Sequence, residues 1–184
     1  EIYDKQRTLE EYELEEQSLS KEFDFYTKNA TKIPAKVSNI RDRIADALAV
    51  GHGQLPFVGE LIQLKDNEKK WEVSVERVLH SFALCMIVPE HLYGKVNAFV
   101  NENDIKGRIV YFKHEAVESL KEMRSKDKRR MLSKLQFNMK SPYCEWVQKK
   151  LIDQFDFICV EDTNDFEEKG KFVTLNGLIR SSNN

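Results

Sequence analysis

A stripe of apolar residues at alternating spacings of three and four is the feature that most constrains how this chain can fold. The stripe runs from residue 2 to residue 47, and twelve of its fourteen positions are apolar. A repeat of 3.5 residues keeps one narrow apolar line facing a partner helix, which is typical of a coiled-coil arm. The remaining 137 residues contain no second stripe of this length, so we expect the partner helix outside this sequence. The stripe positions are Ile2, Lys5, Leu9, Tyr12, Glu16, Leu19, Phe23, Tyr26, Ala30, Ile33, Val37, Ile40, Ile44 and Ala47.

Pro34 interrupts the stripe without changing its phase. Proline lacks the N–H that a helix interior needs, but it suits the first turn of a new helix. We therefore predict an arm over residues 1–33, a kink or fresh helix start at Pro34, and a helix over residues 34–50 that joins the arm to the rest of the chain. Gly51 and Gly53 supply the backbone freedom that ends this helix.

Residues 51–184 have the length of one globular domain, and here the pattern changes from helical to alternating. Short apolar runs that suit strands alternate with amphipathic segments that suit helices, which favours parallel strand pairing with helical crossovers. An Asn176-Gly177 turn between two short apolar runs predicts a terminal hairpin. The predicted fold class is α/β, with a mixed sheet flanked by helices. The predicted strands are 58–64, 84–88, 109–112, 155–160 and the two arms of the hairpin at 172–180, and the predicted helices are 68–82, 91–101 and one that starts near 141.

The overall charge is nearly balanced, with 29 Lys and Arg residues against 31 Asp and Glu residues and a net charge of -2. This balance argues against a strongly basic nucleic-acid protein and against an acidic tail. Cys85, Cys144 and Cys159 form no C-x-x-C pair, which favours reduced cysteines in the core of a cytosolic protein. The sequence has no apolar run of eighteen residues and no export signal, so we expect a soluble, cytoplasmic protein without a membrane partner.

Motifs that would hold a cofactor or a catalytic metal are missing from the sequence. No glycine-rich phosphate loop followed by lysine occurs, and the four histidines are scattered over separate segments. We therefore predict no cofactor, no metal and no catalytic residue. A remote alternative is a metal-dependent nuclease that would use Asp156, Glu167 and Lys169, but the polar surroundings of Glu167 favour a solvated loop.

Positive charge is concentrated between Lys121 and Lys140, where eight basic residues stand against two acidic ones. Such a segment can bind duplex DNA without sequence preference by neutralising phosphates. An equally weighted alternative is a solvated loop that only keeps the domain soluble. The predicted DNA-binding residues are Lys126, Lys128, Arg129, Arg130 and Lys134.

A series of sequence blocks in the globular part resembles a known family. The blocks are Leu55-Pro56-Phe57-Val58-Gly59-Glu60-Leu61-Ile62, Trp71 with Glu76-Arg77-Val78-Leu79-His80-Ser81-Phe82-Ala83-Leu84, Val88-Pro89, Gly107-Arg108-Ile109-Val110-Tyr111-Phe112, and Ser141-Pro142-Tyr143 with Trp146. In this order they resemble the middle of the SMC-like ATPases of bacterial Wadjet anti-plasmid systems, the JetC family, which is related to MukB. The resemblance extends from about Ile33 to Arg180.

This resemblance implies an architecture and a role. In that family two long coiled-coil arms join an ATPase head to a central hinge, and residues 51–184 match the hinge with the incoming arm in front of it. The resemblance implies a homodimerisation domain that orients paired arms, in a DNA-loop-extruding complex with kleisin-like and nuclease subunits. The ATPase motifs are absent from this sequence, so no nucleotide-binding or catalytic residue is carried over.

A dimer interface needs apolar residues at the surface. The terminal hairpin could offer a strand edge for pairing across a two-fold axis. The alternative is an ordinary internal edge of the sheet. The predicted interface residues are Val173, Leu175, Gly177, Leu178 and Ile179.

Overall fold

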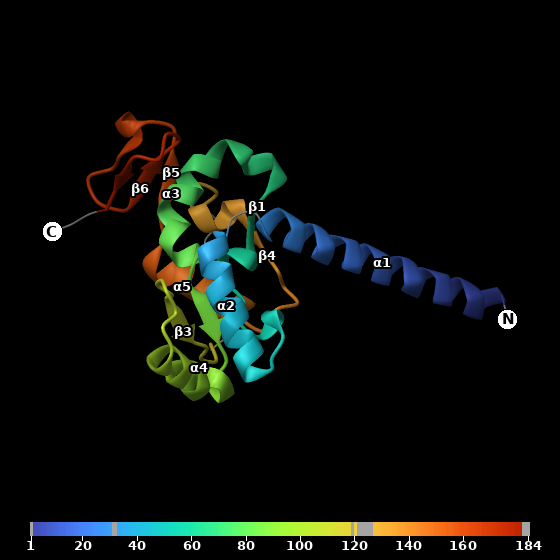
Figure 1. Cartoon of the computed structure of the whole chain (residues 1–184). Helices are drawn as coiled ribbons and strands as arrows, with labels where there is room; N and C mark the ends of the chain where they lie inside the picture. The colour runs from blue at the N-terminus through green and yellow to red at the C-terminus, as the bar shows by residue number, and fades with distance from the viewer. Residues whose placement is uncertain (1, 31–32, 119, 121–126, 182–184) are drawn as a thin grey trace.

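A long helix projects from one side of a body made of short strands and helices (Figure 1). The computed structural model describes residues 2–30, 33–118, 120 and 127–181, and for residues 21–30 it describes the helical backbone and not the side chains. The predicted α/β architecture, in which an arm helix leads into a body of small sheets and flanking helices, is confirmed.

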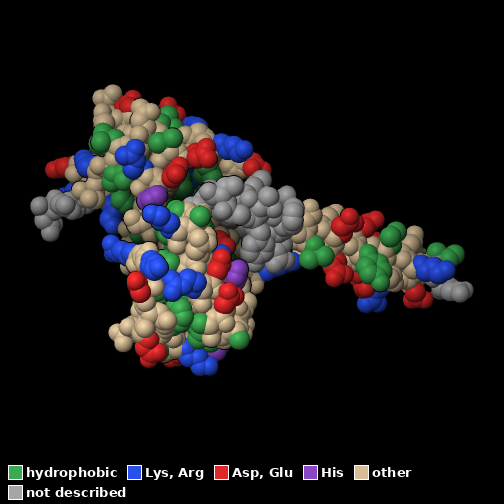
Figure 2. Space-filling view, in the orientation of Figure 1, with side chains coloured by type: hydrophobic (Ala, Val, Ile, Leu, Met, Phe, Trp, Pro, Cys, Tyr) green, Lys and Arg blue, Asp and Glu red, His purple; other side chains and the backbone are tan. Residues whose placement is uncertain are grey.

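Helix α1 (Ile2–Ala30) is the arm predicted from the heptad stripe. The apolar side chains of the stripe are open to solvent along the first twenty residues, with 59% of Leu9 and 58% of Leu19 exposed. Figure 2 shows hydrophobic patches between charged side chains along this projecting helix. The arm therefore presents an uncovered apolar stripe of the kind that pairs with another helix in a coiled coil. No helix in the described residues is both long and apolar enough to cross a bilayer.

Pro34 separates the arm from helix α2 (Ala35–Leu48), and its carbonyl accepts two hydrogen bonds from the first turn of α2, at 3.0 and 3.1 Å. The predicted helix start at Pro34 is confirmed. The second part of the stripe, however, is not a coiled-coil seam. Ile40 and Ile44 are buried against the body together with Ala45, which widens the apolar face beyond a narrow seam. Helix α2 is therefore an amphipathic helix packed on the body.

The first half of the body contains a parallel strand pair with a helical crossover, as the alternating pattern predicts. Residues 56–58 lie antiparallel to the first strand of this pair, on the side away from the second strand. There the Ile87 N–H donates to the Pro56 carbonyl at 2.8 Å. In chain order the elements of this half are η1 (His52–Gln54), η2 (Val58–Glu60), β1 (Ile62–Leu64), η3 (Asp66–Trp71), α3 (Glu72–Ala83), β2 (Met86–Val88), α4 (Glu90–Glu102) and β3 (Tyr111–Lys113).

The second half shares part of this order, because a 3₁₀ turn, a strand, a helix and a further strand follow one another in both halves. Its two parallel strands, however, are joined by a segment with a 3₁₀ turn instead of a helix like α4. Its elements are η5 (Met131–Lys134), β4 (Leu135–Phe137), α5 (Cys144–Gln154), β5 (Ile158–Val160), η6 (Thr163–Asp165), β6 (Phe172–Thr174) and β7 (Ile179–Arg180). Residues 129–131 lie antiparallel along β5, with the Met131 N–H bonded to the Phe157 carbonyl at 2.9 Å. Strand β5 pairs in parallel with β6, and β7 pairs with β6 in antiparallel orientation, so the predicted terminal hairpin is confirmed.

An antiparallel pair of strands, β1 and β4, joins the two halves. Gln63 lies opposite Gln136 at the centre of this pair, and apolar residues flank both glutamines. In each half a 3₁₀ turn leads into this strand and a helix follows it. An antiparallel ladder has a local two-fold axis at its centre, so β1 and β4 are related by such an axis near the paired glutamines.

Two hydrophobic clusters fill the described part of the body. The larger cluster draws on both halves and contains an aromatic group, in which the rings of Phe82 and Phe155 stack at 5.0 Å and those of Phe112 and Trp146 lie 5.7 Å apart. Aromatic side chains bury the most apolar area per residue, so this group binds the halves together. The smaller cluster lies under α2 and includes Ile44.

The sheet prediction needs three corrections. Residues 58–64 do not form one strand, because residues 58–60 are the turn η2 and only residues 62–64 are extended. At Gly59 a side chain would approach the Ala83 carbonyl oxygen to 3.0 Å, so glycine lets this turn pack on α3. Strand β4 lies inside the basic segment, where the pattern predicts no strand. The described strands form three small sheets instead of one mixed sheet.

Cys85, Cys144 and Cys159 are free and buried, as the sequence predicts. Burial raises the pKa of Cys85 and of Cys159 to about 11, and it also raises the pKa of Cys144. The reason is that a thiolate is poorly solvated in an apolar core. All three thiols are therefore protonated and weakly reactive in the native state at neutral pH.

We expect the three thiols to resist modification at pH 8 in the native protein and to react in the unfolded protein. A chromogenic disulfide reagent counts the reactive thiols in each state. Unfolded thiols ionise near pH 9, while Cys85 and Cys159 remain protonated up to about 11 in the fold. The free energy of unfolding should therefore be unaffected by these groups below pH 9 and fall as the pH rises from 9 to 11. Rapid labelling of all three native thiols would contradict this assignment.

Replacing Gly59 by alanine should lower the free energy of unfolding by about 1–3 kcal/mol, as overpacking does in a close contact. The added methyl group would meet the Ala83 carbonyl oxygen at 3.0 Å and the Ile33 Cδ1 at 3.4 Å. Gly94 is exposed within α4, and a methyl group there would meet no neighbouring side chain within 4 Å, so Gly94→Ala is the matched control. That control should raise stability by about 0.5–1 kcal/mol. Urea unfolding followed by circular dichroism compares them, and equal midpoints would show that the turn tolerates a side chain.

Candidate interaction surfaces

The β6–β7 hairpin ends in an exposed edge strand. Its turn spans residues 175–178, with Gly177 in the left-handed conformation at φ 81° that favours glycine. The Gly177 N–H donates to the Thr174 carbonyl at 2.9 Å, and the Thr174 N–H donates to the Leu178 carbonyl at 3.0 Å. These bonds fix β7 as the outer strand of its sheet.

The residues predicted for the interface divide into a buried and an exposed set. Val173 and Gly177 are buried within the chain, and Leu175 packs against the larger cluster. Leu178 and Ile179 are 55% and 40% exposed, so only these two offer apolar surface. Because Leu178 bonds to β6 and antiparallel residues alternate in direction, the backbone N–H and C=O of Ile179 point to the open side.

Strand β3 forms a second open edge in the other half of the body. The His114 N–H donates to the Val88 carbonyl of β2 at 2.7 Å. Alternate residues of a parallel strand face the same neighbour, so the backbone groups of Tyr111 and Lys113 point away from β2. No strand among the described residues pairs with that side. The sequence analysis predicts no interface on β3, because a short apolar run is the only feature that marks this strand in the sequence.

Side chains on and beside β3 limit what can pair with it. The Lys113 ammonium lies 3.0 Å from the Glu90 carboxylate, and this hydrogen bond is the main cause that raises the Lys113 pKa. A charge on an edge strand opposes unspecific strand pairing. The His114 ring packs edge-on against Tyr143 with centroids 4.9 Å apart, and burial lowers its pKa. The edge therefore selects for a partner that accommodates a lysine.

The protein's own carboxylates pair with much of the charge predicted to bind DNA. Arg129 lies 3.1 Å from Asp127 and 3.4 Å from Glu167. The hydrogen bonds from Arg129 lower the pKa of Asp127, so this carboxylate stays ionised at neutral pH. Arg130 lies 3.3 Å from Asp156. Both arginines are thus engaged within the chain, which reduces the charge that this segment offers to a phosphate.

Lys134 belongs to the core. Its side chain is 6% exposed, and its ammonium lies 3.6 Å from the Glu68 carboxylate and 4.9 Å from the ring centroid of Trp71. It also donates to the Lys128 carbonyl at 3.1 Å. Lys134 therefore does not reach a phosphate, which corrects the prediction for this residue. Lys128 is exposed, and Lys126 lies outside the described residues.

Two residues of the nuclease alternative are used in ion pairs. Asp156 pairs with Arg130 and Glu167 pairs with Arg129, while Lys169 is exposed. No group of three His, Cys, Asp or Glu side chains in the described part of the chain could hold a metal ion. The geometry gives the nuclease alternative no support.

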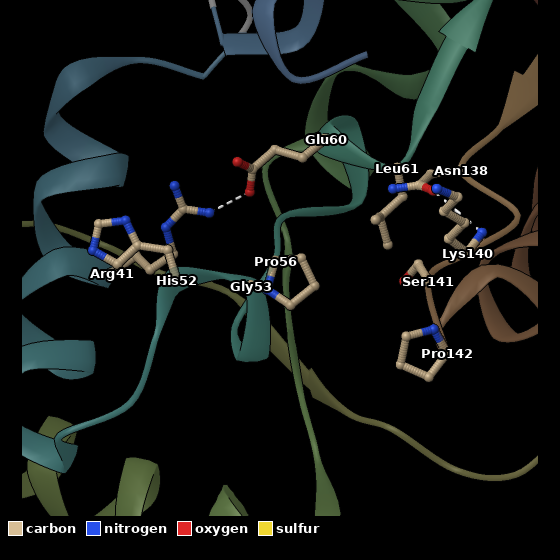
Figure 3. Close-up of a pocket in the computed structure, with 10 residues that line it drawn as sticks. All are labelled: Arg41, His52, Gly53, Pro56, Glu60, Leu61, Asn138, Lys140, Ser141 and Pro142. Atoms are coloured by element: carbon tan, nitrogen blue, oxygen red, sulfur yellow. Dashed lines mark hydrogen bonds and ion pairs between the residues drawn. The ribbon is translucent and has the colours of Figure 1, made fainter. Parts of the chain in front are cut away.

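A pocket of about 340 Å³ lies where α2 meets both halves of the body. In Figure 3, Arg41 and Glu60 form an ion pair on one side, Asn138 and Lys140 lie on the other, and Pro56 lies between them. One wall comes from α2 and the first half, and the other comes from the loop before α5. The pocket thus marks the junction of three parts of the fold.

Comparison with known proteins identifies the fold by structure and not by sequence. No protein-family model matches the chain, and no curated protein matches it. The SMC hinge domain of Geobacillus stearothermophilus, solved as an asymmetric dimer, aligns with a TM-score of 0.55 and 14% identity over 92% of this chain and 70% of that one. The chain has the fold of an SMC hinge domain.

Two archaeal hinge structures agree with this assignment. The SMC hinge domain of Pyrococcus furiosus aligns with a TM-score of 0.51 and 15% identity over 90% of this chain and 88% of that one. A Pyrococcus furiosus hinge with an extended coiled coil aligns at 0.50 and 16% identity over 97% of this chain and 75% of that one. At these identities the similarity establishes the hinge fold. The last alignment covers 97% of this chain and therefore extends over most of the arm.

A charge-reversal variant in the basic segment can test DNA binding only if it still folds, and the two lysines Lys134 and Lys128 should differ in this respect. Lys134→Glu should lower the free energy of unfolding by about 3 kcal/mol or more, because it places a second carboxylate beside Glu68 in a buried site. Lys128→Glu should change it by less than about 0.5 kcal/mol, because Lys128 is exposed. Thermal unfolding measures both variants. A Lys134→Glu variant as stable as wild type would refute the core assignment.

Proposed function

We propose that this chain is the dimerisation hinge of an SMC-like ATPase and that it orients a pair of coiled-coil arms. The observation that carries the proposal is the presence, on a hinge fold, of two sheet edges, β3 and β7, whose outer sides pair with no other strand in the described part of the chain. Both edges lie on the side of the body away from the arm (Figure 1). Open edges present N–H and C=O groups that a second copy of the chain can satisfy.

A two-fold dimer can cover both edges at once. If β7 of one copy pairs with β3 of the other, the symmetry repeats the contact and the dimer closes. Ile179 and Tyr111 then supply outward-facing backbone groups, while Leu178 and Ile179 supply apolar surface. Because both edges face away from the arm, pairing there leaves the arms free to leave the dimer on its outer sides.

Sequence blocks shared with the Wadjet SMC-like ATPases extend the proposal to a parent protein. That parent is a cytoplasmic ATPase in plasmid defence, and its complex includes kleisin-like and nuclease subunits that act together on DNA. In this proposal the hinge contributes geometry, while nucleotide hydrolysis belongs to the head and DNA cleavage to the nuclease subunit. Support comes from the order of the blocks and from the arm that precedes the hinge fold.

Sedimentation equilibrium of the full chain at tens of micromolar should find a dimer, and Ile179→Pro should convert it to a monomer. Proline removes the outward N–H of Ile179 while the ladder bonds to β6 involve the neighbouring residues. Circular dichroism should find the variant folded. A wild-type monomer at this concentration would overturn the proposal.

Control variants distinguish the hinge edge from other apolar surfaces. Met139 is 72% exposed in the loop before α5 and lies on neither edge, so Met139→Glu should leave the dimer intact. The double variant Leu9→Glu with Leu19→Glu interrupts the apolar stripe of the arm at two positions. Should this arm variant be monomeric while Ile179→Pro stays dimeric, association resides in the arm and the hinge interface is refuted.

A further inference from the structure

Three consecutive residues of α2 contact three different segments of the body. Arg41 forms an ion pair with Glu60 of η2. The Asp42 carboxylate lies 3.3 Å from His52 Nε2 of η1, and Arg43 Nη2 donates to the backbone carbonyl of Asp104, after α4, at 3.2 Å. The polar contacts of one short stretch of α2 therefore reach both sides of the helix.

These contacts fix the rotation of α2 about its own axis. Successive residues of an α-helix are separated by about 100° because one turn holds 3.6 residues. The three side chains thus span about 200° of the circumference, and Ile40 and Ile44 are buried against the smaller cluster. A rotation of α2 breaks at least one polar contact and exposes apolar surface.

Arg41 is the most enclosed of the three residues. Its side chain is 10% exposed, its guanidinium lies 4.5 Å above the Phe57 ring, and one oxygen of its partner Glu60 also accepts the Phe57 N–H at 2.8 Å. A charged pair in such a site is strongly favoured over either charge alone, because an unpaired buried charge is costly. The pocket beside the pair leaves open space toward the loop before α5 (Figure 3).

The turn η2 is shared by α2 and the arm. Helix α1 packs against η2 and β1, and a methyl group at Gly59 of η2 would lie 3.4 Å from Ile33 Cδ1. Glu60 of the same turn holds Arg41 of α2. The Arg41–Glu60 pair therefore ties α2 to the segment of the body against which the arm rests.

We infer that Arg41, Asp42 and Arg43 form a rotational clamp that couples the direction of the arm to the conformation of the hinge. The clamp holds α2 at a fixed phase, and η2 passes that constraint to α1. A change in the hinge that moves η2 shifts both helices together. This inference concerns a single copy of the chain and holds whether or not the hinge self-associates.

The test measures a distance between the arm and the body by pulsed electron paramagnetic resonance. Spin labels are attached at Glu13→Cys on α1 and Asn101→Cys on α4, both exposed, while the native cysteines are buried. Labelled chain is diluted with an excess of unlabelled chain, so that only distances within one copy contribute. Arg41→Met, which keeps an apolar stem over Phe57, should broaden and shift the distance distribution relative to the otherwise wild-type labelled chain.

Two further variants keep the test decisive if Arg41→Met folds poorly. Glu60→Gln keeps the shape of the side chain and the acceptor for the Phe57 N–H but removes the charge, and Arg43→Gln changes an exposed contact only. Both should broaden the distribution, with the larger change for Glu60→Gln. The matched control is Arg7→Met, which breaks the exposed pair with Glu11 on the arm and should leave the distribution unchanged.

A structural role without coupling has a different outcome. If folded Glu60→Gln and Arg43→Gln both give the wild-type distance distribution, even with lowered unfolding midpoints, the residues only stabilise the body and the clamp is refuted. If the Arg7→Met control broadens the distribution as much as Glu60→Gln does, the broadening does not depend on the clamp contacts and the clamp is likewise refuted. A broadening confined to the clamp variants supports the coupling.

Discussion

Backbone pairing between β1 and β4 holds the two halves of the body in one fixed relation. Each half has only a small sheet of its own, and a sheet of two or three strands is marginal unless it shares a hydrophobic core. The Asn138 N–H bonds to the Leu61 carbonyl and the Lys65 N–H to the Lys134 carbonyl, both at 2.9 Å, so the ladder continues beyond the central three residues. This pairing and the common aromatic cluster make the halves one unit, and they set the positions of the open edges at β3 and β7.

The order of the elements can be predicted from the sequence because most are marked by strong local patterns. The heptad stripe, the break at Pro34 and the continuous apolar run that contains Met86–Val88 each determine local structure with little help from distant residues. The hairpin around Asn176-Gly177 is equally local. The hinge fold itself follows from the order of the blocks, although no family model matches the chain.

Features that depend on distant partners cannot be predicted in the same way. Strand β4 is three residues long and follows a basic run, so only its pairing with β1 identifies it. Lys134 looks like a surface charge in the sequence, but Glu68 and Trp71 enclose it. The two halves share part of their order of elements without an evident sequence repeat, so their relation is seen only from the pairing of β1 with β4. Likewise, nothing local distinguishes the buried Val173 from the exposed Ile179. The two lie opposite each other on one face of the sheet, so their exposure differs only because Val173 is in the central strand and Ile179 in the edge strand, with different cover from the rest of the fold.

The position of η2 has a mechanical consequence. The arm rests on this turn, Arg41 holds α2 to it, and β1 begins two residues after it ends. The arm is also continuous with α2 in the chain, so a displacement of the arm is transmitted to α2, to η2 and, through β1, to the seam between β1 and β4. Tension or torsion on the arm would thus act on the relation between the two halves, which also positions the edge strands β3 and β7.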